Sequence, residues 1–163
     1  MQLKPWRWMA GVSLVSLILL AGCQANATNP ATLSKATTGP IRITLDHTAY
    51  GVSDPFGVTV SNASKSMYYS IDGKSACTFL ELQKYDSAKK QWGMVAPCTI
   101  AEPLNALEMP AGISEPFSLA PGSSSNQNEW QSGIYRVAIV YSANADGKTD
   151  AQTAYSAAFA VNS

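Results

Sequence analysis

Histidine is nearly absent from this chain, charges are sparse, and the familiar catalytic motifs are missing. Of 163 residues 13% are charged, and His47 is the only histidine. GxSxG, HExxH, P-loop and GxGxxG patterns do not occur. A serine triad would have to use His47, but its neighbour Asp46 is expected on the opposite face of a strand, where it cannot orient the imidazole. We therefore expect no enzyme and interpret His47 as an exposed residue at a strand end.

Metal ligands are also scarce. Met67, Met94 and Met109 offer thioether sulfur, which suits Cu(I). No two of them are close in the sequence, so we expect them to fill the core or its rim. Asp146 and Asp150 stand at the two sides of a turn, whereas calcium needs clustered carboxylates. The sequence predicts no metal and no cofactor, with a periplasmic metal-binding protein as an alternative.

The N-terminus has the pattern of an export signal. Met1–Trp8 carries Lys4 and Arg7, and Met9–Leu20 is almost wholly apolar. This run of about a dozen residues is shorter than the roughly 20 that a membrane-spanning helix needs. A basic start followed by a short apolar region predicts a signal peptide, which is absent from the mature protein.

The signal ends in Leu20-Ala21-Gly22-Cys23, a sequence that resembles the bacterial lipobox. The resemblance implies that residues 1–22 are removed and that Cys23 becomes the first residue, modified by acyl chains such as palmitate. The alternative is an ordinary export signal followed by an unrelated cysteine. Gln24 stands where aspartate is associated with retention at the inner membrane. In a bacterium with two membranes, the resemblance therefore implies a lipid-anchored envelope protein of the outer membrane.

The charge balance excludes one class of partner. Without Lys4 and Arg7 the mature chain has nine basic and eleven acidic side chains, a net charge of about −2. No basic patch is evident, so we expect no nucleic-acid partner and no electrostatic attachment to anionic lipid. Membrane attachment must then come from the lipid on Cys23, where two acyl chains suffice for stable anchoring.

The residues after the anchor are expected to form a flexible tether. Gln24–Pro40 contains one leucine and no aromatic residue, so it cannot bury enough surface to offset its ordering entropy. As a flexible coil it would span roughly 20–25 Å. Residues 23–40 are thus the lipidated cysteine and tether, and residues 41–163 are expected to fold as one domain.

Cys77 and Cys98 form an even pair once Cys23 is set aside, which favours a disulfide in an exported protein. If residues 79–85 and 91–95 form a hairpin with Ser87 and Ala88 at its tip, opposed residue numbers sum to 175, and the two cysteines face each other. The bond would close a loop of about 20 residues and stabilise the fold by roughly 3 kcal/mol. A two-cysteine metal site or redox pair is the alternative, although no CxxC motif occurs.

Short strands separated by turn signals predict an all-β fold. Residues 134–141 form the expected central strand, because both of its faces are apolar except at Arg136. Further strands are expected at 41–45, 56–60, 67–71 and 117–120, with an irregular edge strand or one helical turn within 99–112. A final strand is expected to place Tyr155, Ala157, Phe159 and Val161 on one face. This pattern is typical of a two-sheet β-sandwich.

The motif Gly133-x-Tyr135-x-Val137 resembles the tyrosine corner of immunoglobulin-like domains. Together with residues 56–62, 80–85 and 119–122, it is similar to the immunoglobulin-like domains of bacterial envelope lipoproteins and, more distantly, to the bacterial intracellular proteinase inhibitor family. The resemblance implies an immunoglobulin-like sandwich in which Tyr135 is structural. The chain departs from antibody domains because its cysteine pair lies within or beside one hairpin and does not bridge two sheets.

A non-enzymatic domain of this kind is expected to bind another protein or to support an envelope assembly. The candidate partner-binding residues are Trp130, Trp92 and Tyr85, because exposed aromatic rings make strong contacts. For each of them, packing against the core is the competing interpretation. The connections 103–116 and 123–132 are the expected recognition loops. The alternative function is inhibition of a protease or lysozyme by an exposed loop.

Overall fold

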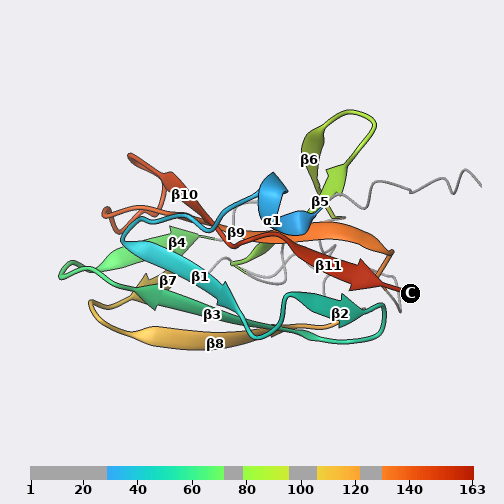
Figure 1. Cartoon of the computed structure of the whole chain (residues 1–163). Coiled ribbons are helices and arrows are strands. Elements are labelled where there is room, and N and C mark those ends of the chain that lie inside the picture. Colours follow the sequence, from blue (N-terminus) through green and yellow to red (C-terminus); the bar gives the residue numbers. More distant parts are fainter. Residues whose placement is uncertain (1–28, 72–78, 96–105, 122–129) are drawn as a thin grey trace, which may run out of the picture.

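The computed structural model describes residues 29–71, 79–95, 106–121 and 130–163. These residues form an all-β fold, with one short helix, α1 (Pro30–Leu33), as the exception (Figure 1). Within these ranges no helix is both long and apolar enough to span a membrane. The predictions for Cys23, Cys77 and Cys98 fall outside the described residues, as does most of the expected loop 123–132.

A three-stranded antiparallel sheet forms one side of the core. Its strands β1 (Ile41–Leu45), β3 (Phe56–Asn62) and β8 (Ser114–Leu119) lie in the order β1-β3-β8. In β3 every second residue is buried, as its alternating sequence predicts. The strand continues to Asn62, which the predicted range of 56–60 missed. Asn62 is 2% exposed, and its side-chain amide donates hydrogen bonds to the backbone oxygens of Ser66 and Met109.

The larger sheet is built around β9 (Gly133–Tyr141), the predicted central strand. Its order is β2 (Ala49–Gly51), β11 (Phe159–Asn162), β9, β5 (Glu81–Asp86) and β6 (Gln91–Met94), and β10 (Gln152–Tyr155) also pairs with β9. Four alternate residues of β9 are at most 2% exposed: Tyr135, Val137, Ile139 and Tyr141. The prediction of a central strand is confirmed, since β9 has β11 and β5 as neighbours on its two sides.

A small third sheet pairs β4 (Tyr68–Ile71) with β7 (Ala106–Met109). Within 99–112, predicted to hold an irregular edge strand or a helical turn, residues 106–109 form a strand, and residues 99–105 lie outside the described ranges. Tyr69 and Ser142 exchange two backbone hydrogen bonds of 2.8 Å, and the Ser70 hydroxyl donates to the backbone oxygen of Val140. These bonds join the small sheet to the end of β9.

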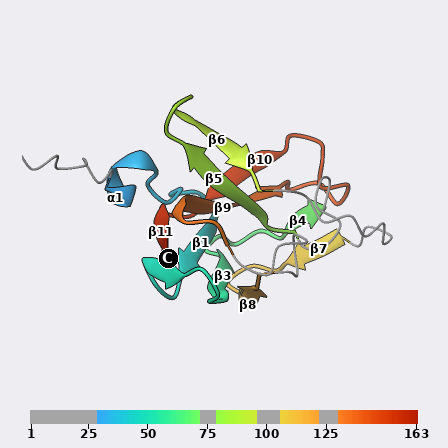
Figure 2. The same ribbon diagram turned by 90° about the vertical axis from the view of Figure 1, so that its right-hand side faces the viewer.

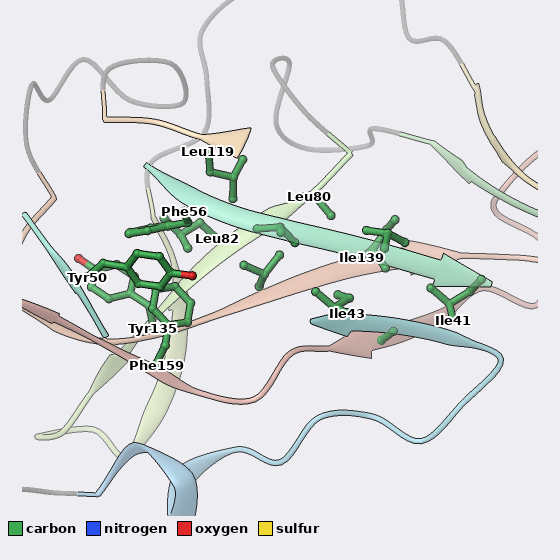
Figure 3. Close-up of a cluster of buried hydrophobic side chains, with 14 of the residues drawn as sticks. Ile41, Ile43, Tyr50, Phe56, Leu80, Leu82, Leu119, Tyr135, Ile139 and Phe159 are labelled. Atoms are coloured by element: carbon green, nitrogen blue, oxygen red, sulfur yellow. The ribbon is translucent and has the colours of Figure 1, made fainter. Parts of the chain in front are cut away.

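Aromatic rings fill the core between the two larger sheets (Figure 3). Phe56 from β3 stacks on Trp130, with ring centroids 4.7 Å apart, and meets Phe159 from β11 edge-on at 5.0 Å. The ring centroid of Tyr50 lies 4.8 Å from that of Phe56, on another side of the Phe56 ring. Because Phe56 is fully buried, it links the two sheets at one end of the core.

The predicted single C-terminal strand is wrong, because the chain forms two strands in different registers. In β10, Tyr155 lies opposite Ala138, whereas in β11, Phe159 lies opposite Tyr135. The numbers of two paired residues sum to 293 in β10 and to 294 in β11. A register offset of one residue moves alternate side chains to the other face of the sheet. Tyr155 consequently points outward, while Phe159 points into the core.

The prediction of a free tether over Gln24–Pro40 is wrong for its second half. The Thr37 N–H donates to the Tyr155 oxygen at 2.9 Å, and the Tyr155 N–H donates to the Thr37 hydroxyl at 2.8 Å. The Ala158 N–H donates to the Ser34 oxygen at 3.1 Å. The register shift between β10 and β11 leaves backbone groups there for this segment to bind. The ordered part of the domain therefore begins before Ile41.

The predicted hairpin register is also wrong. In the β5–β6 pair Lys84 lies opposite Gly93 and Tyr85 opposite Trp92, so opposed residue numbers sum to 177 and not 175. The turn is longer than expected because Ser87 to Lys90 all lie in it. The disulfide between Cys77 and Cys98 thus loses its support from the register. It remains a prediction based on an even pair of cysteines in an exported chain.

Candidate functional site

The β5–β6 hairpin projects from the body of the domain (Figures 1 and 2). Its turn is fixed by Asp86, whose Oδ1 accepts hydrogen bonds from the N–H groups of Ala88 and Lys89 at 2.9 and 3.1 Å. These backbone donors, that of Lys89 first, lower the pKa of Asp86. Lys89 also makes a 3.5 Å ion pair with Asp86. The turn therefore uses its one carboxylate internally.

A groove of about 510 Å³ lies between this hairpin and the segment that leads into β9. The groove is lined by residues of β5 and its turn, of β6 and the position after it, and of β9 and the segment before it: Lys84, Tyr85, Asp86, Ser87, Gly93, Met94, Val95, Trp130, Gln131 and Tyr135. Two of these, Trp130 and Tyr135, belong to the aromatic core. The groove thus combines large rings with a few polar groups.

Trp130 is a core residue that also contributes to the wall of the groove. It is 3% exposed, and its indole N–H donates to the backbone oxygen of Asp54 at 2.9 Å. The backbone N–H of Trp130 donates to the backbone oxygen of Val52 at 2.8 Å. The candidate role of Trp130 as an exposed anchor is therefore wrong, because its ring packs on Phe56 and its polar atom is already paired.

Tyr135 has the hydrogen bond expected of a tyrosine corner. Its hydroxyl donates to the backbone oxygen of Gln131, four residues upstream, at 2.6 Å. Burial raises the pKa of Tyr135 to about 12. The Lys84 Nζ atom lies 5.6 Å from the centroid of this ring and donates to Gln131 Oε1 at 3.1 Å. Lys84 and Gln131 are therefore both held at the groove.

The other two aromatic candidates lie on the hairpin. Trp92 and Tyr85 are half-buried, with ring centroids 5.3 Å apart. The Arg136 guanidinium is 4.4 Å from the Trp92 ring centroid and 4.0 Å from that of Tyr155, and its Nε donates to Gln83 Oε1 at 2.8 Å.

Sequence reasoning missed this stack around Arg136 because the register shift before β11 decides where Tyr155 points. The lone arginine in the central strand was the available signal. Burial lowers the pKa of Arg136, and the electrostatic interaction with Tyr155 opposes that shift.

His47 and Asp46 lie closer together than the sequence predicted. His47 Nδ1 is 3.3 Å from Asp46 Oδ1, because β1 ends at Leu45 and the strand rule for opposite faces no longer applies. The Tyr50 hydroxyl donates to the same oxygen of Asp46 at 2.5 Å and lowers the pKa of that carboxyl. Both side chains of the ion pair are at least half exposed. The contact between His47 and Asp46 is therefore a surface contact within the turn between β1 and β2.

The methionines considered as copper ligands are dispersed over the fold. Met109 is 6% exposed in β7, whereas Met94 is 39% exposed on β6 and Met67 is 40% exposed before β4. Across the described ranges, no three His, Cys, Asp or Glu side chains come close enough together to hold a metal ion.

Comparison with solved structures gives a remote structural likeness. No protein-family model and no curated protein matches the sequence. The chain is similar to a beta-glucosidase from Listeria innocua, solved in complex with gluconolactone, at 10% identity and a TM-score of 0.33. The match covers 78% of this chain and 16% of the glucosidase. A likeness this remote carries no argument about the fold or the function.

Proposed function

We propose that this chain is a lipid-anchored protein of the bacterial cell envelope whose immunoglobulin-like domain binds another protein without catalysing a reaction. The groove beneath the β5–β6 hairpin is the observation that carries the binding part of the proposal. The lipid on Cys23, from the lipobox resemblance, would hold the domain at the membrane.

The strand order supports an immunoglobulin-like domain. One sheet has the order β1-β3-β8, and the other contains β11, β9 and β5 as neighbours, which corresponds to the A, B and E strands facing the G, F and C strands of such domains. The corner Tyr135 lies near the start of β9, in the place of strand F. The third sheet, β4 with β7, is an addition to this plan.

The state of the polar groups in the groove favours recognition over catalysis. The Lys84 ammonium donates a hydrogen bond to the Gln131 side chain. The Asp86 carboxylate accepts two backbone hydrogen bonds and forms an ion pair with Lys89. Side chains held in this way can present fixed donors and acceptors to a partner. The buried rings of Trp130 and Tyr135 close the groove on the core side, and Met94, which is 39% exposed, supplies apolar surface together with Val95.

Site-specific photocrosslinking in the native envelope tests the binding function. A photoreactive residue at Ser87, exposed at the groove, is compared with one at Arg42, exposed on β1 of the opposite sheet. A discrete crosslinked product is expected from position 87 and not from position 42. Products of equal yield from both positions, or none from either, would contradict the proposed site.

The anchor has its own test. Cys23→Ser should release the protein from the membrane fraction, because the lipid is the only expected attachment. A substituted protein that stays in the membrane fraction would refute the lipoprotein proposal. Slowing of a protease or lysozyme by the purified full-length protein would instead favour the inhibitor alternative.

A further inference from the structure

The strand β6 is an edge whose second side has no partner among the described residues. In sheet order β6 comes last, paired with β5 alone. The Val95 N–H donates to the Leu82 oxygen at 2.9 Å, which marks Leu82 and Val95 as a pair joined by hydrogen bonds. Such pairs alternate with pairs that are not joined. The backbone N–H and C=O groups of Trp92 and Met94 therefore point away from β5.

This edge lacks most of the features that usually block strand pairing. β6 contains no proline and no charged residue in its sequence Gln-Trp-Gly-Met. Gly93 leaves space at its centre, because a Cβ atom there would contact only the Lys84 oxygen at 4.0 Å. The groove runs along the same strand, since Gly93, Met94 and Val95 line it. An open edge and an adjacent groove thus occur at one place.

We propose that β6 binds an extended segment of a partner protein as an added strand. This inference rests on the proposed binding function and specifies how binding occurs. In an added strand, alternate side chains point to opposite faces. One set would enter the groove beside Trp130 and Tyr135, and the other would cover Trp92 and Met94. The exposed outward-facing backbone groups of β6 would supply the hydrogen bonds.

The charges around the edge indicate the chemistry of the segment. Lys84 lines the groove, and Lys89 and Lys90 lie in the turn at the hairpin tip. The nearby carboxylate of Asp86 already binds the turn itself. The tip is therefore net positive and complements an acidic residue. The best occupant is an extended peptide with an apolar side chain for the groove and a carboxylate toward the tip.

Met94 allows a test that separates the backbone from the side chain. Met94→Pro removes the outward N–H but none of the hydrogen bonds between β6 and β5, and proline is tolerated where the N–H of an edge strand faces solvent. Met94→Ala keeps the N–H and removes the exposed side chain. Both variants should melt close to the temperature of the original protein, which establishes that the hairpin is intact.

The probe is a library of random dodecapeptides displayed on phage and selected on the full-length protein in detergent micelles. We expect enriched peptides that combine an apolar residue with an acidic one. Synthetic copies should bind Met94→Pro about tenfold more weakly than Met94→Ala, since both variants lose the Met94 side chain and only Met94→Pro also loses a hydrogen bond. Methylation of alternate backbone nitrogens of the peptide should weaken binding in the same way, with the protein unchanged.

Several results would overturn strand addition. Peptides that bind Met94→Pro and Met94→Ala equally would overturn it, and the proposed groove function would survive if Ser87 still crosslinked. No enrichment of any peptide would also overturn it. Dimerisation in sedimentation experiments that Met94→Pro abolishes would assign the edge to a second copy of this chain.

Discussion

Tyr135→Phe removes one hydroxyl from the structure and leaves the ring in place. The tyrosine is 1% exposed, and its hydroxyl donates to the Gln131 oxygen at 2.6 Å. A neutral hydrogen bond of this kind contributes about 0.5–1.5 kcal/mol. Gln131 is exposed and lines the groove, so water can reach its carbonyl and limit the cost of losing its partner. We expect a loss of about 1 kcal/mol in the free energy of unfolding.

Urea denaturation measured by tryptophan fluorescence can resolve this change, because Trp130 stacks on Phe56 in the same cluster. A loss of about 1 kcal/mol corresponds to a melting temperature lower by roughly 2–8 °C for a domain of this size. Tyr141→Phe is the matched control. Tyr141 is 2% exposed, but its hydroxyl donates to the exposed Gln152 side chain at 3.1 Å. Tyr141→Phe should therefore lose less unfolding free energy than Tyr135→Phe.

A Tyr135→Phe protein as stable as the original would refute the argument that this hydrogen bond holds the start of β9. Equal losses in Tyr135→Phe and Tyr141→Phe would also contradict it, since they would assign the effect to any buried tyrosine hydroxyl. An unchanged slope of unfolding free energy against urea is required for the comparison, because a changed slope signals a different unfolded state.

Two further predictions concern pH and redox conditions. Burial raises the pKa of Tyr135 to about 12 from its ordinary value of 10.0, so its contribution is complete below pH 10 and is lost as the pH rises towards 12. Denaturation at pH 8 and pH 11 should show this loss, and Tyr135→Phe should show less of it. If Cys77 and Cys98 are bonded, reduction should lower stability by roughly 3 kcal/mol, and a Cys77→Ser/Cys98→Ser protein should be insensitive to reductant. Two free thiols in the oxidised protein by mass spectrometry would refute the disulfide.

Alternation of apolar residues was enough to place most strands. Residues 41–45 have the same bounds as β1, and the predicted strand 134–141 lies within β9, because alternate side chains of both strands meet a core that apolar groups fill. The tyrosine-corner resemblance predicted a structural Tyr135, and in the structure its hydroxyl donates to the Gln131 backbone oxygen. In these cases the local pattern and the tertiary packing require the same residues.

The errors occurred where a local pattern has more than one solution. The hairpin register depends on a turn that runs from Ser87 to Lys90, and the same alternation fits registers that differ by two residues. The tether residue Thr37 looked unstructured because its partner, Tyr155, is far away in the sequence. For Trp130 the two interpretations were an exposed anchor and packing against the core, and the structure confirms packing against the core.

Residue type and spacing were enough to predict the all-β class, the position of the central strand and an exported, lipid-anchored chain. The tertiary structure was needed to show that β6, among the described strands, is an edge beside a groove and that Arg136 lies between Trp92 and Tyr155. Both features depend on which strands end up as neighbours. Packing between segments that are distant in the sequence determines which strands pair, and the periodic pattern within one segment does not predict it.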